Sequence, residues 1–162
     1  MKEHQLHVVR NVHDPLIQKH YHELIQLVRE GINAEHHILA EKPNYDPSYS
    51  FPIDNDENKI SQSIATYLAE GLATFVLHDD RLVGVGFTYP IDEYKCMVGP
   101  LSVSESHRRQ GICKQMIAKL EDEVRNMGYK ACVLIVLNNN PAKALYANRG
   151  YADESVVMAR AL

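Results

Sequence analysis

The chain of 162 residues is long enough to bury one core, and we expect residues 1–162 to form a single domain. Hydrophobic residues make up 45% of it and charged residues 23%, with a net charge of −4, which is ordinary for a globular protein and disfavours general nucleic-acid binding. No apolar run approaches the roughly 20 residues that span a bilayer, and the polar start Met-Lys-Glu-His-Gln is unlike a signal peptide. These features predict a cytoplasmic protein that binds neither nucleic acid nor membrane.

Cysteine and histidine spacing predicts neither a disulfide framework nor a metal site. Cys96, Cys113 and Cys132 are unevenly spaced and form no CxxC pair. The nine histidines show no HExxH pattern and no spacing that would pair them with the cysteines. We therefore expect no bound metal.

The first third of the chain predicts a strand, a helix and a long loop. Residues 5–12 are rich in β-branched side chains, as in a strand. Asp14-Pro15 is typical of a helix start, and apolar residues recur at helical spacing from there until Gly31, where we expect the helix to stop. Residues 32–57 contain three prolines and lose this period, which predicts a loop.

The middle of the chain predicts a helix and three antiparallel strands. Residues 60–69 have helical spacing and precede Gly71. Apolar runs at 73–78 and 82–89 flank a turn, which favours a hairpin, and residues 94–103 return as a third strand. Because proline cannot donate to a ladder, Gly99-Pro100 within this strand predicts an edge or a bulge.

The last third predicts alternating helices and strands. A helix is expected over 109–127, and a strand buried on both faces over the apolar run 132–137. A short helix at 141–148 and a final strand at 155–159 complete the order β-α-α-β-β-β-α-β-α-β. This order predicts an α/β fold with a mixed, largely antiparallel sheet.

Residues 102–117 combine the features of an anion site. They join the strand ending at Val103 to the start of the helix predicted over 109–127, where backbone N–H groups lack intrahelical partners and the helix dipole is positive. Gly111 leaves room for phosphate oxygens, and Arg108, Arg109 and Lys114 add positive charge. The stretch is therefore suited to one small anionic ligand such as a pyrophosphate.

Two sequence blocks carry a resemblance to a known family. Arg108-x-x-Gly111-x-Cys113 resembles the (Gln/Arg)-x-x-Gly-x-(Gly/Ala) acyl-CoA signature of the Gcn5-related N-acetyltransferase (GNAT) superfamily, and Leu101-Ser102-Val103 looks like its strand four. Residues 139–151 are similar to its Asn-x-x-Ala-x-x-Leu-Tyr-x-x-x-Gly-(Phe/Tyr) block. The resemblance implies a sheet with splayed strands four and five, and direct transfer of an acetyl group from acetyl-CoA to a primary amine of a small molecule or peptide.

The resemblance also implies roles for individual residues. Tyr146 would protonate the leaving thiolate as general acid. The acetyl-CoA cosubstrate would be bound by Leu101, Ser102, Val103, Arg108, Arg109, Gln110, Gly111, Ile112, Cys113, Lys114 and Asn139. The strand-four glutamate of histone-type relatives falls near Met97 here, which leaves the general base unassigned, and Glu93 is the candidate we name, acting through a water.

Several alternatives stay open. Tyr45, Tyr49 and Phe51, with the nearby acids, either shape a pocket for a cationic amine or pin a surface loop. Cys113 is either a small residue that fits its place or a thiol activated by the helix N-terminus. A non-catalytic acyl-CoA-binding regulatory module is the alternative to an enzyme, and the chain is either a monomer or a homodimer.

Overall fold

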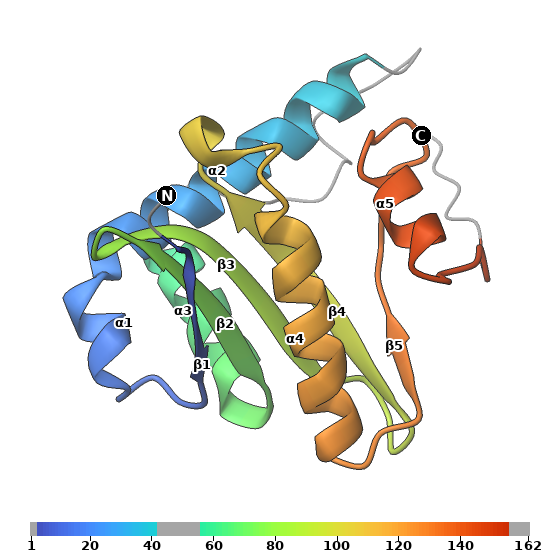
Figure 1. Cartoon of the computed structure of the whole chain (residues 1–162), viewed down its shortest axis with the longest axis horizontal. Coiled ribbons are helices and arrows are strands. Elements are labelled where there is room, and N and C mark those ends of the chain that lie inside the picture. The colour runs from blue at the N-terminus through green and yellow to red at the C-terminus, as the bar shows by residue number, and fades with distance from the viewer. Residues whose placement is uncertain (1–2, 42–55, 156–162) are drawn as a thin grey trace.

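A sheet of five strands in the order β1-β2-β3-β4-β5 positions the candidate site (Figure 1). The computed structural model describes residues 3–41 and 56–155. The strands are β1 (Gln5–Val9), β2 (Leu72–His78), β3 (Arg81–Pro90), β4 (Lys95–Val103) and β5 (Ala131–Val133). Neighbours from β1 to β4 pair antiparallel, whereas β4 and β5 pair parallel. The predicted mixed, largely antiparallel sheet is confirmed, with a first strand that ends earlier than expected.

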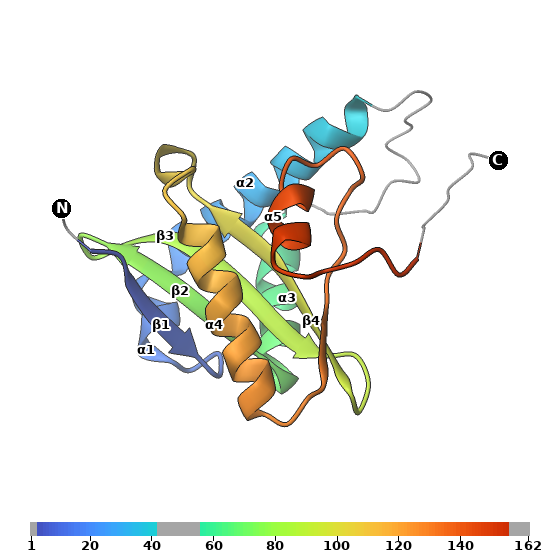
Figure 2. The ribbon, with the colours of Figure 1, turned by 45° about the vertical axis from the view of Figure 1, so that its right-hand side comes forward.

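Helices cover both faces of this sheet. The helices α1 (Pro15–Lys19), α2 (Tyr21–Ala40) and α3 (Glu57–Glu70) precede β2, α4 (Ile112–Asn126) joins β4 to β5, and α5 (Lys143–Asn148) follows β5. Successive strand residues point to opposite faces, so Phe75 packs in the core under α2 and α3 whereas Val76 packs in the core under α4. Figures 1 and 2 show α4 on one face and α1 to α3 on the other.

The helix predicted from Asp14-Pro15 to Gly31 starts where expected, but it is broken at His20 and ends later than predicted. Asp14 caps α1 as expected, accepting a hydrogen bond from the Leu16 N–H, but the chain turns at His20 and α2 then runs through Gly31 to Ala40. A Cβ at position 31 would lie 3.2 Å from the Ser102 Oγ. Glycine therefore serves here to let α2 approach β4 closely, and residues 32–40 are helix instead of the predicted loop.

The remainder of that loop is described only at its end. Asp56 caps α3 by accepting hydrogen bonds from the N–H groups of Asn58 and Lys59, and Glu57 is the first residue of the helix. Tyr45, Tyr49 and Phe51, the aromatic residues that we considered for an amine pocket, lie outside the described residues. That interpretation stays a prediction.

The strand β4 bulges where proline interrupts it. Leu101 pairs with Gly86 and Val98 pairs with Thr88, so Gly99 and Pro100 together lie opposite a single residue of β3. The bulge predicted from Gly99-Pro100 is confirmed. It lies in the half of β4 that has left its parallel partner, because pairing with β5 ends at Met97 and Val133.

Beyond that last pair the two strands diverge, which is the predicted splay (Figure 1). The strand predicted over 132–137 is correspondingly shorter, and Ile135 is 67% exposed instead of buried on both faces. Within the described residues, β5 has a neighbour along its β4 edge only. Most of the predicted final strand, 155–159, lies outside the described residues.

Candidate functional site

A short loop joins β4 to α4 and forms one side of the candidate site. Ser104 precedes a 3₁₀ turn at Glu105–His107, and the Arg108 Nε then donates a hydrogen bond to the Val103 carbonyl at 3.0 Å. Arg109 and Gly111 both have left-handed backbones, with φ of 65° and 80°. These two turns delay the start of α4 to Ile112, three residues after the predicted start at Arg109, and leave Gly111 as the residue before the helix.

The N-terminus of α4 is open to an anion. No side chain among the described residues caps it, and its first intrahelical bond runs from the Gln115 N–H to the Gly111 carbonyl. The N–H groups of residues 112–114 are therefore left without intrahelical partners at the positive end of the helix dipole. A Cβ at Gly111 would meet nothing within 4 Å. The loop thus provides backbone donors and free space together, as phosphate binding requires.

Side chains of the loop divide into charged and structural groups. Arg108, Arg109, Gln110 and Lys114 are exposed around the helix start. Ile112, in contrast, is buried in the core under α4, so only its backbone can contact a ligand. The predicted cluster of positive charge at the helix start is thus present on the surface.

The end of β4 contributes backbone more than side chains. Leu101 and Val103 pack against the core under α4, and Ser102 donates a hydrogen bond of 2.6 Å to the Leu27 carbonyl of α2. Ladder pairing toward β5 has ended at Met97, so the edge of residues 101–103 on that side makes no strand pair with described residues. A ligand arm can therefore pair with this edge.

Tyr146 of α5 lies beside the start of α4. Burial raises the pKa of its hydroxyl, and the nearby Cys113 and Glu35 raise it further. Two contacts from the Arg149 guanidinium to the Glu121 carboxylate, one of them 3.1 Å from Nε to Oε1, hold α5 against α4. The Tyr146 ring also packs edge-on to Tyr151, 6.1 Å between centroids. The structure thus brings the predicted acid and the predicted anion loop together.

Cys113 is half-buried in this region, and burial raises the pKa of its thiol to about 11. We had considered that the helix N-terminus would lower it. Burial disfavours the charged thiolate, so the structure favours a protonated Cys113 over the activated thiol.

The structure does not bring Glu93 to the site. Glu93 is exposed in the turn before β4, and the next residue, Tyr94, accepts a hydrogen bond of 2.8 Å from the Lys130 N–H, just past the C-terminal end of α4. The 15 residues of α4 span about 22 Å. Glu93 therefore lies a helix length from Cys113 and Tyr146, and our choice of it as base is wrong on position.

Asn139 lies on the other wall, on the chain that continues from β5. Its side-chain Nδ2 donates a hydrogen bond of 3.0 Å to the Ile38 carbonyl of α2. This contact ties the end of α2 to the diverging chain. Because Nδ2 already makes this bond, the predicted contact of Asn139 with a cofactor arm would have to use its other polar atoms.

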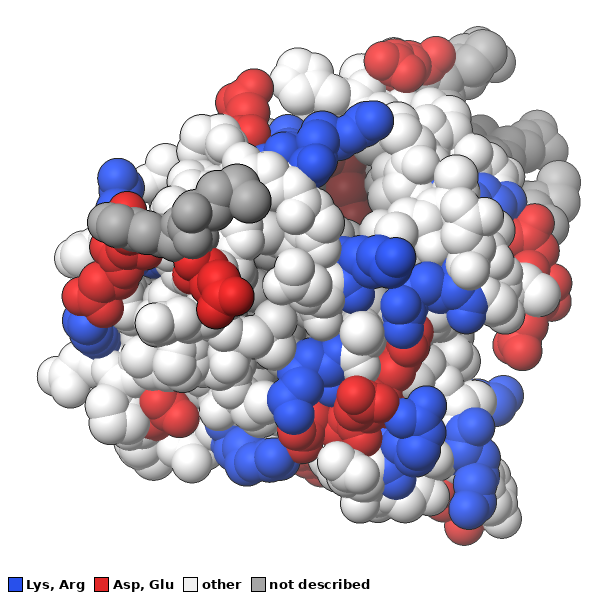
Figure 3. Space-filling model, viewed as in Figure 1, with Lys and Arg blue, Asp and Glu red and all other residues white. Residues whose placement is uncertain are grey.

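Glu35 is the acidic residue that the sequence analysis missed. It lies on α2 between the residues that contact Ser102 and Asn139. Although the residue is exposed, desolvation by the surrounding protein raises the pKa of its carboxyl group, and its charge raises the pKa of both Tyr67 and Tyr146. Only the helical phase of residues 32–40 places it here, and we had predicted a loop for them. Figure 3 shows a hollow between the start of α4 and α5, with basic side chains at its rim and acidic atoms at its floor.

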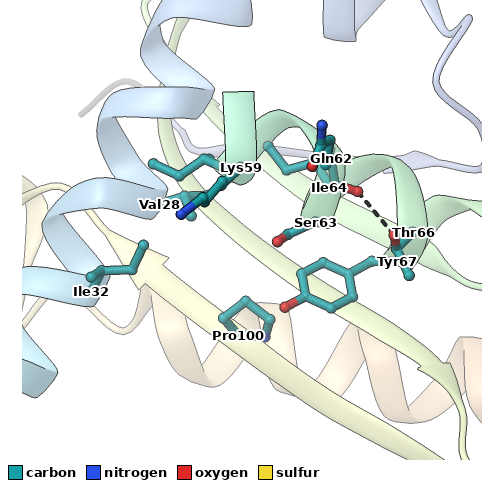
Figure 4. Close-up of a pocket in the computed structure, with 10 residues that line it drawn as sticks. Val28, Ile32, Lys59, Gln62, Ser63, Ile64, Thr66, Tyr67 and Pro100 are labelled. Atoms are coloured by element: carbon teal, nitrogen blue, oxygen red, sulfur yellow. Dashed lines mark hydrogen bonds between the residues drawn. The ribbon is translucent and has the colours of Figure 1, made fainter. Parts of the chain in front are cut away.

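A cavity of about 500 Å³ opens on the other side of β4, between α2 and α3 (Figure 4). Apolar side chains dominate its wall, including Val28, Ile32 and Pro100 of the β4 bulge. The Tyr67 hydroxyl points toward Pro100 in Figure 4. The remaining lining residues are Lys59, Ile60, Gln62, Ser63, Ile64 and Thr66.

The described ranges contain no candidate metal site and no candidate membrane-spanning helix. Over residues 3–41 and 56–155, no three or more His, Cys, Asp or Glu side chains are grouped so as to hold a metal ion. None of the helices in these ranges is both long and apolar enough to cross a membrane.

Comparison with known proteins gives a consistent family. The model of the acetyltransferase (GNAT) family matches residues 32–151. A putative acetyl transferase from Pyrococcus furiosus superposes with a TM-score of 0.70 at 21% identity, covering 99% of this chain and 100% of that chain. An aminoglycoside acetyltransferase from an uncultured soil metagenomic sample gives 0.65 at 18% identity, with 99% of both chains covered. No curated protein sequence matches significantly.

A further solved structure was determined with a ligand. An aminoglycoside N-acetyltransferase in complex with CoA superposes with a TM-score of 0.63 at 12% identity, covering 99% of this chain and 96% of that chain. At these identities the likeness concerns the fold. The five-stranded sheet with its parallel β4–β5 pair is shared with these structures.

Proposed function

Because the chain belongs to the acetyltransferase (GNAT) family, we propose that it transfers an acetyl group from acetyl-CoA directly to a primary amine of a small molecule or peptide. The observation that carries this proposal is the uncapped N-terminus of α4 behind the left-handed Gly111. It provides donors for a pyrophosphate at the point where β4 and β5 diverge. A similarly folded acetyltransferase solved with CoA supports the choice of donor.

The cofactor would lie along the start of α4 and enter between the diverging strands. The N–H groups of residues 112–114 would bind the pyrophosphate, and Arg108, Arg109 and Lys114 would neutralise its charge. The pantetheine arm would pair with the free edge of residues 101–103, with Asn139 on the opposite wall. This path points the thioester toward Tyr146.

Chemistry would then follow from placement and one proton donor. A neutral amine attacks the thioester carbon, the C–N bond forms, and the C–S bond breaks. Tyr146 donates its proton to the departing sulfur. Burial raises the Tyr146 pKa, so the hydroxyl is protonated at neutral pH. Because a thiol is a stronger acid than a phenol, this transfer requires the Tyr146 oxygen to be held in hydrogen-bond contact with the sulfur while the C–S bond breaks. Holding both substrates in line supplies about 7–11 kcal/mol of the barrier.

The acceptor would approach from the α2–α3 side of the sheet. The cavity there, about 500 Å³, falls in the range of small-molecule pockets. Its apolar wall ends at Pro100, on the bulge of the strand whose other edge would hold the cofactor. A small amine carrying an apolar substituent fits this wall best.

The test measures binding and turnover separately. Thermal unfolding with acetyl-CoA reports binding, and CoA release in the presence of glucosamine, kanamycin, spermidine and alanyl-alanine reports transfer. Replacing the acid, as Tyr146→Phe, should lower kcat about 10²-fold while leaving the acetyl-CoA-induced rise in Tm unchanged. Binding without CoA release for any amine would indicate a non-catalytic module, and no rise in Tm at millimolar acetyl-CoA would refute the proposal.

A further inference from the structure

The helix α2 spans the divergence between β4 and β5. At Leu27 its carbonyl accepts the Ser102 hydroxyl of β4 at 2.6 Å, and at Ile38 its carbonyl accepts the Asn139 amide at 3.0 Å. These contacts are eleven residues apart, or about 16 Å along the axis. One helix therefore connects both walls of the proposed cofactor site.

Glu35 lies on the stretch of α2 between these contacts and on the same face. Gly31 faces Ser102 so closely that a Cβ would lie 3.2 Å from its Oγ. Residues four apart on a helix share a face, and so do residues three apart. Glu35 is four residues after Gly31 and three before Ile38, so its side chain projects toward the region where the strands part.

Glu35 also borders the proposed acceptor cavity, because it shares a helix face with Ile32, three residues before it, which lines that cavity. Its charge raises the pKa of Tyr146, on the cofactor side, and of Tyr67, which lines the acceptor cavity. Its own side chain is open to solvent, yet the surrounding protein raises its pKa by desolvation, against a smaller opposing effect of His36. A carboxylate that is reachable and partly desolvated is suited to meet an ammonium group.

We propose that Glu35 binds the ammonium group of the acceptor and takes one of its protons, so that the neutral amine attacks the thioester. This role rests on the proposed acetyl transfer and replaces Glu93, which lies a helix length away. The proton taken by Glu35 leaves to solvent after each turnover. The second proton lost by nitrogen, as the amide forms, replaces the one that Tyr146 gives to sulfur.

The decisive variant is Glu35→Gln, which keeps the shape and removes the charge. We expect kcat for the best amine of the four-amine panel to fall about 10²-fold at pH 7, with the acetyl-CoA-induced rise in Tm unchanged. Glu35→Asp should retain part of the activity. Glu41→Gln removes an equal charge from an exposed residue at the end of the same helix and should behave as the parent.

A pH series separates proton transfer from a structural role. Raising the pH supplies neutral amine from solution, so the ratio of parent to Glu35→Gln activity should fall at least tenfold between pH 7 and pH 9. The titratable groups facing Glu35 are His36, Tyr67 and Tyr146, with Cys113 beside Tyr146. Removing the Glu35 charge lowers the pKa of Tyr67 and Tyr146, but burial still holds both above the ordinary tyrosine value, so both stay protonated in either protein up to pH 9.

The outcomes separate failure of the role proposed for Glu35 from failure of the proposed acetyl transfer on which it rests. If the parent releases CoA and Glu35→Gln matches it in rate and pH profile, Glu35 has no part in the reaction while the transferase stands. A constant ratio across pH would reduce Glu35 to a positioning role and overturn proton transfer. If the parent releases no CoA with any of the four amines, the proposed function and this role are both wrong.

Discussion

The two glycines that flank α4 offer a matched test of the anion site. Gly111 precedes the helix with φ of 80° and Gly128 follows it with φ of 91°, and a Cβ at either would meet nothing within 4 Å. An L-residue in this conformation costs about 1–2 kcal/mol. Gly111→Asp and Gly128→Asp therefore begin with the same backbone penalty, and they differ in which end of the helix dipole receives the new charge.

Without ligand, the variant at the helix start should be the more stable. A carboxylate near a helix N-terminus stabilises the folded protein by about 0.3–1 kcal/mol. Near the C-terminus, where the dipole is negative, it destabilises the folded protein by a similar amount. The free energy of unfolding of Gly111→Asp should then exceed that of Gly128→Asp by roughly 1 kcal/mol. For a chain of this length that is about 2–4 °C in Tm.

Acetyl-CoA should reverse this order. At a concentration 100-fold above Kd, binding stabilises the parent by about 2.7 kcal/mol, or roughly 5–11 °C. Gly128→Asp should keep that shift. Gly111→Asp places a carboxylate where the pyrophosphate would bind, and a 100-fold loss of affinity would leave only about 0.4 kcal/mol.

Thermal unfolding of the three proteins with and without acetyl-CoA measures all of these quantities. The expected signature is a crossing of the two variants on addition of ligand. If Gly111→Asp shows the full ligand shift of the parent, the phosphates do not bind at this helix start.

Three further predictions concern the surroundings of the site. Arg149→Met leaves Glu121 without its partner, so urea titrations should show the free energy of unfolding fall by about 1–3 kcal/mol. The value of kcat should also fall, because α5 is held less firmly against α4. An unchanged kcat would contradict a role for the placement of α5. Burial, with His78, His4 and Arg81, lowers the pKa of His107, so as the pH falls the unfolded chain binds a proton before the folded one does. The free energy of unfolding should therefore decrease below about pH 6.5, and less steeply in His107→Gln. Parallel curves of unfolding free energy against pH for the two proteins would refute this. With its pKa raised to about 11, Cys113 should react slowly with iodoacetamide at pH 7.5 and faster toward pH 10, whereas rapid labelling at neutral pH would show an activated thiol.

Local rules were enough for the elements that their own residues determine. The hairpin of β2 and β3, the bulge at Gly99-Pro100 and the apolar face of α4 follow from turn residues, a missing donor and helical spacing. The loop before α4 was also predictable, because its glycine and charged residues are contiguous. Only the start of α4 was misplaced, because no feature of the sequence indicated the left-handed backbone of Arg109.

Contacts between distant parts of the chain decided the rest. Gly31 resembles a helix stop, but a glycine is needed there because Ser102, seventy-one residues away, leaves no room for a side chain. Taking Gly31 as a stop hid the helical phase that places Glu35. Glu93 was chosen for its nearness to β4 in sequence, although the strand carries it away from α5. The short β5 and the exposed Ile135 likewise follow from a contact that its own residues do not determine, because pairing with β4 ends at Val133.

The sheet separates two layers that can change independently. Ile112 and Met116 pack with Val76 and Val83 on the cofactor side, whereas α2 and α3 pack in a separate core around Phe75 and Phe87. Exchanging side chains around the proposed acceptor cavity between α2 and α3 would therefore alter which amine fits without repacking the layer that carries the proposed phosphate loop. The strand β4 borders both proposed sites, so the proposal allows a new specificity to arise on one face of the sheet while the cosubstrate bound at the other stays the same.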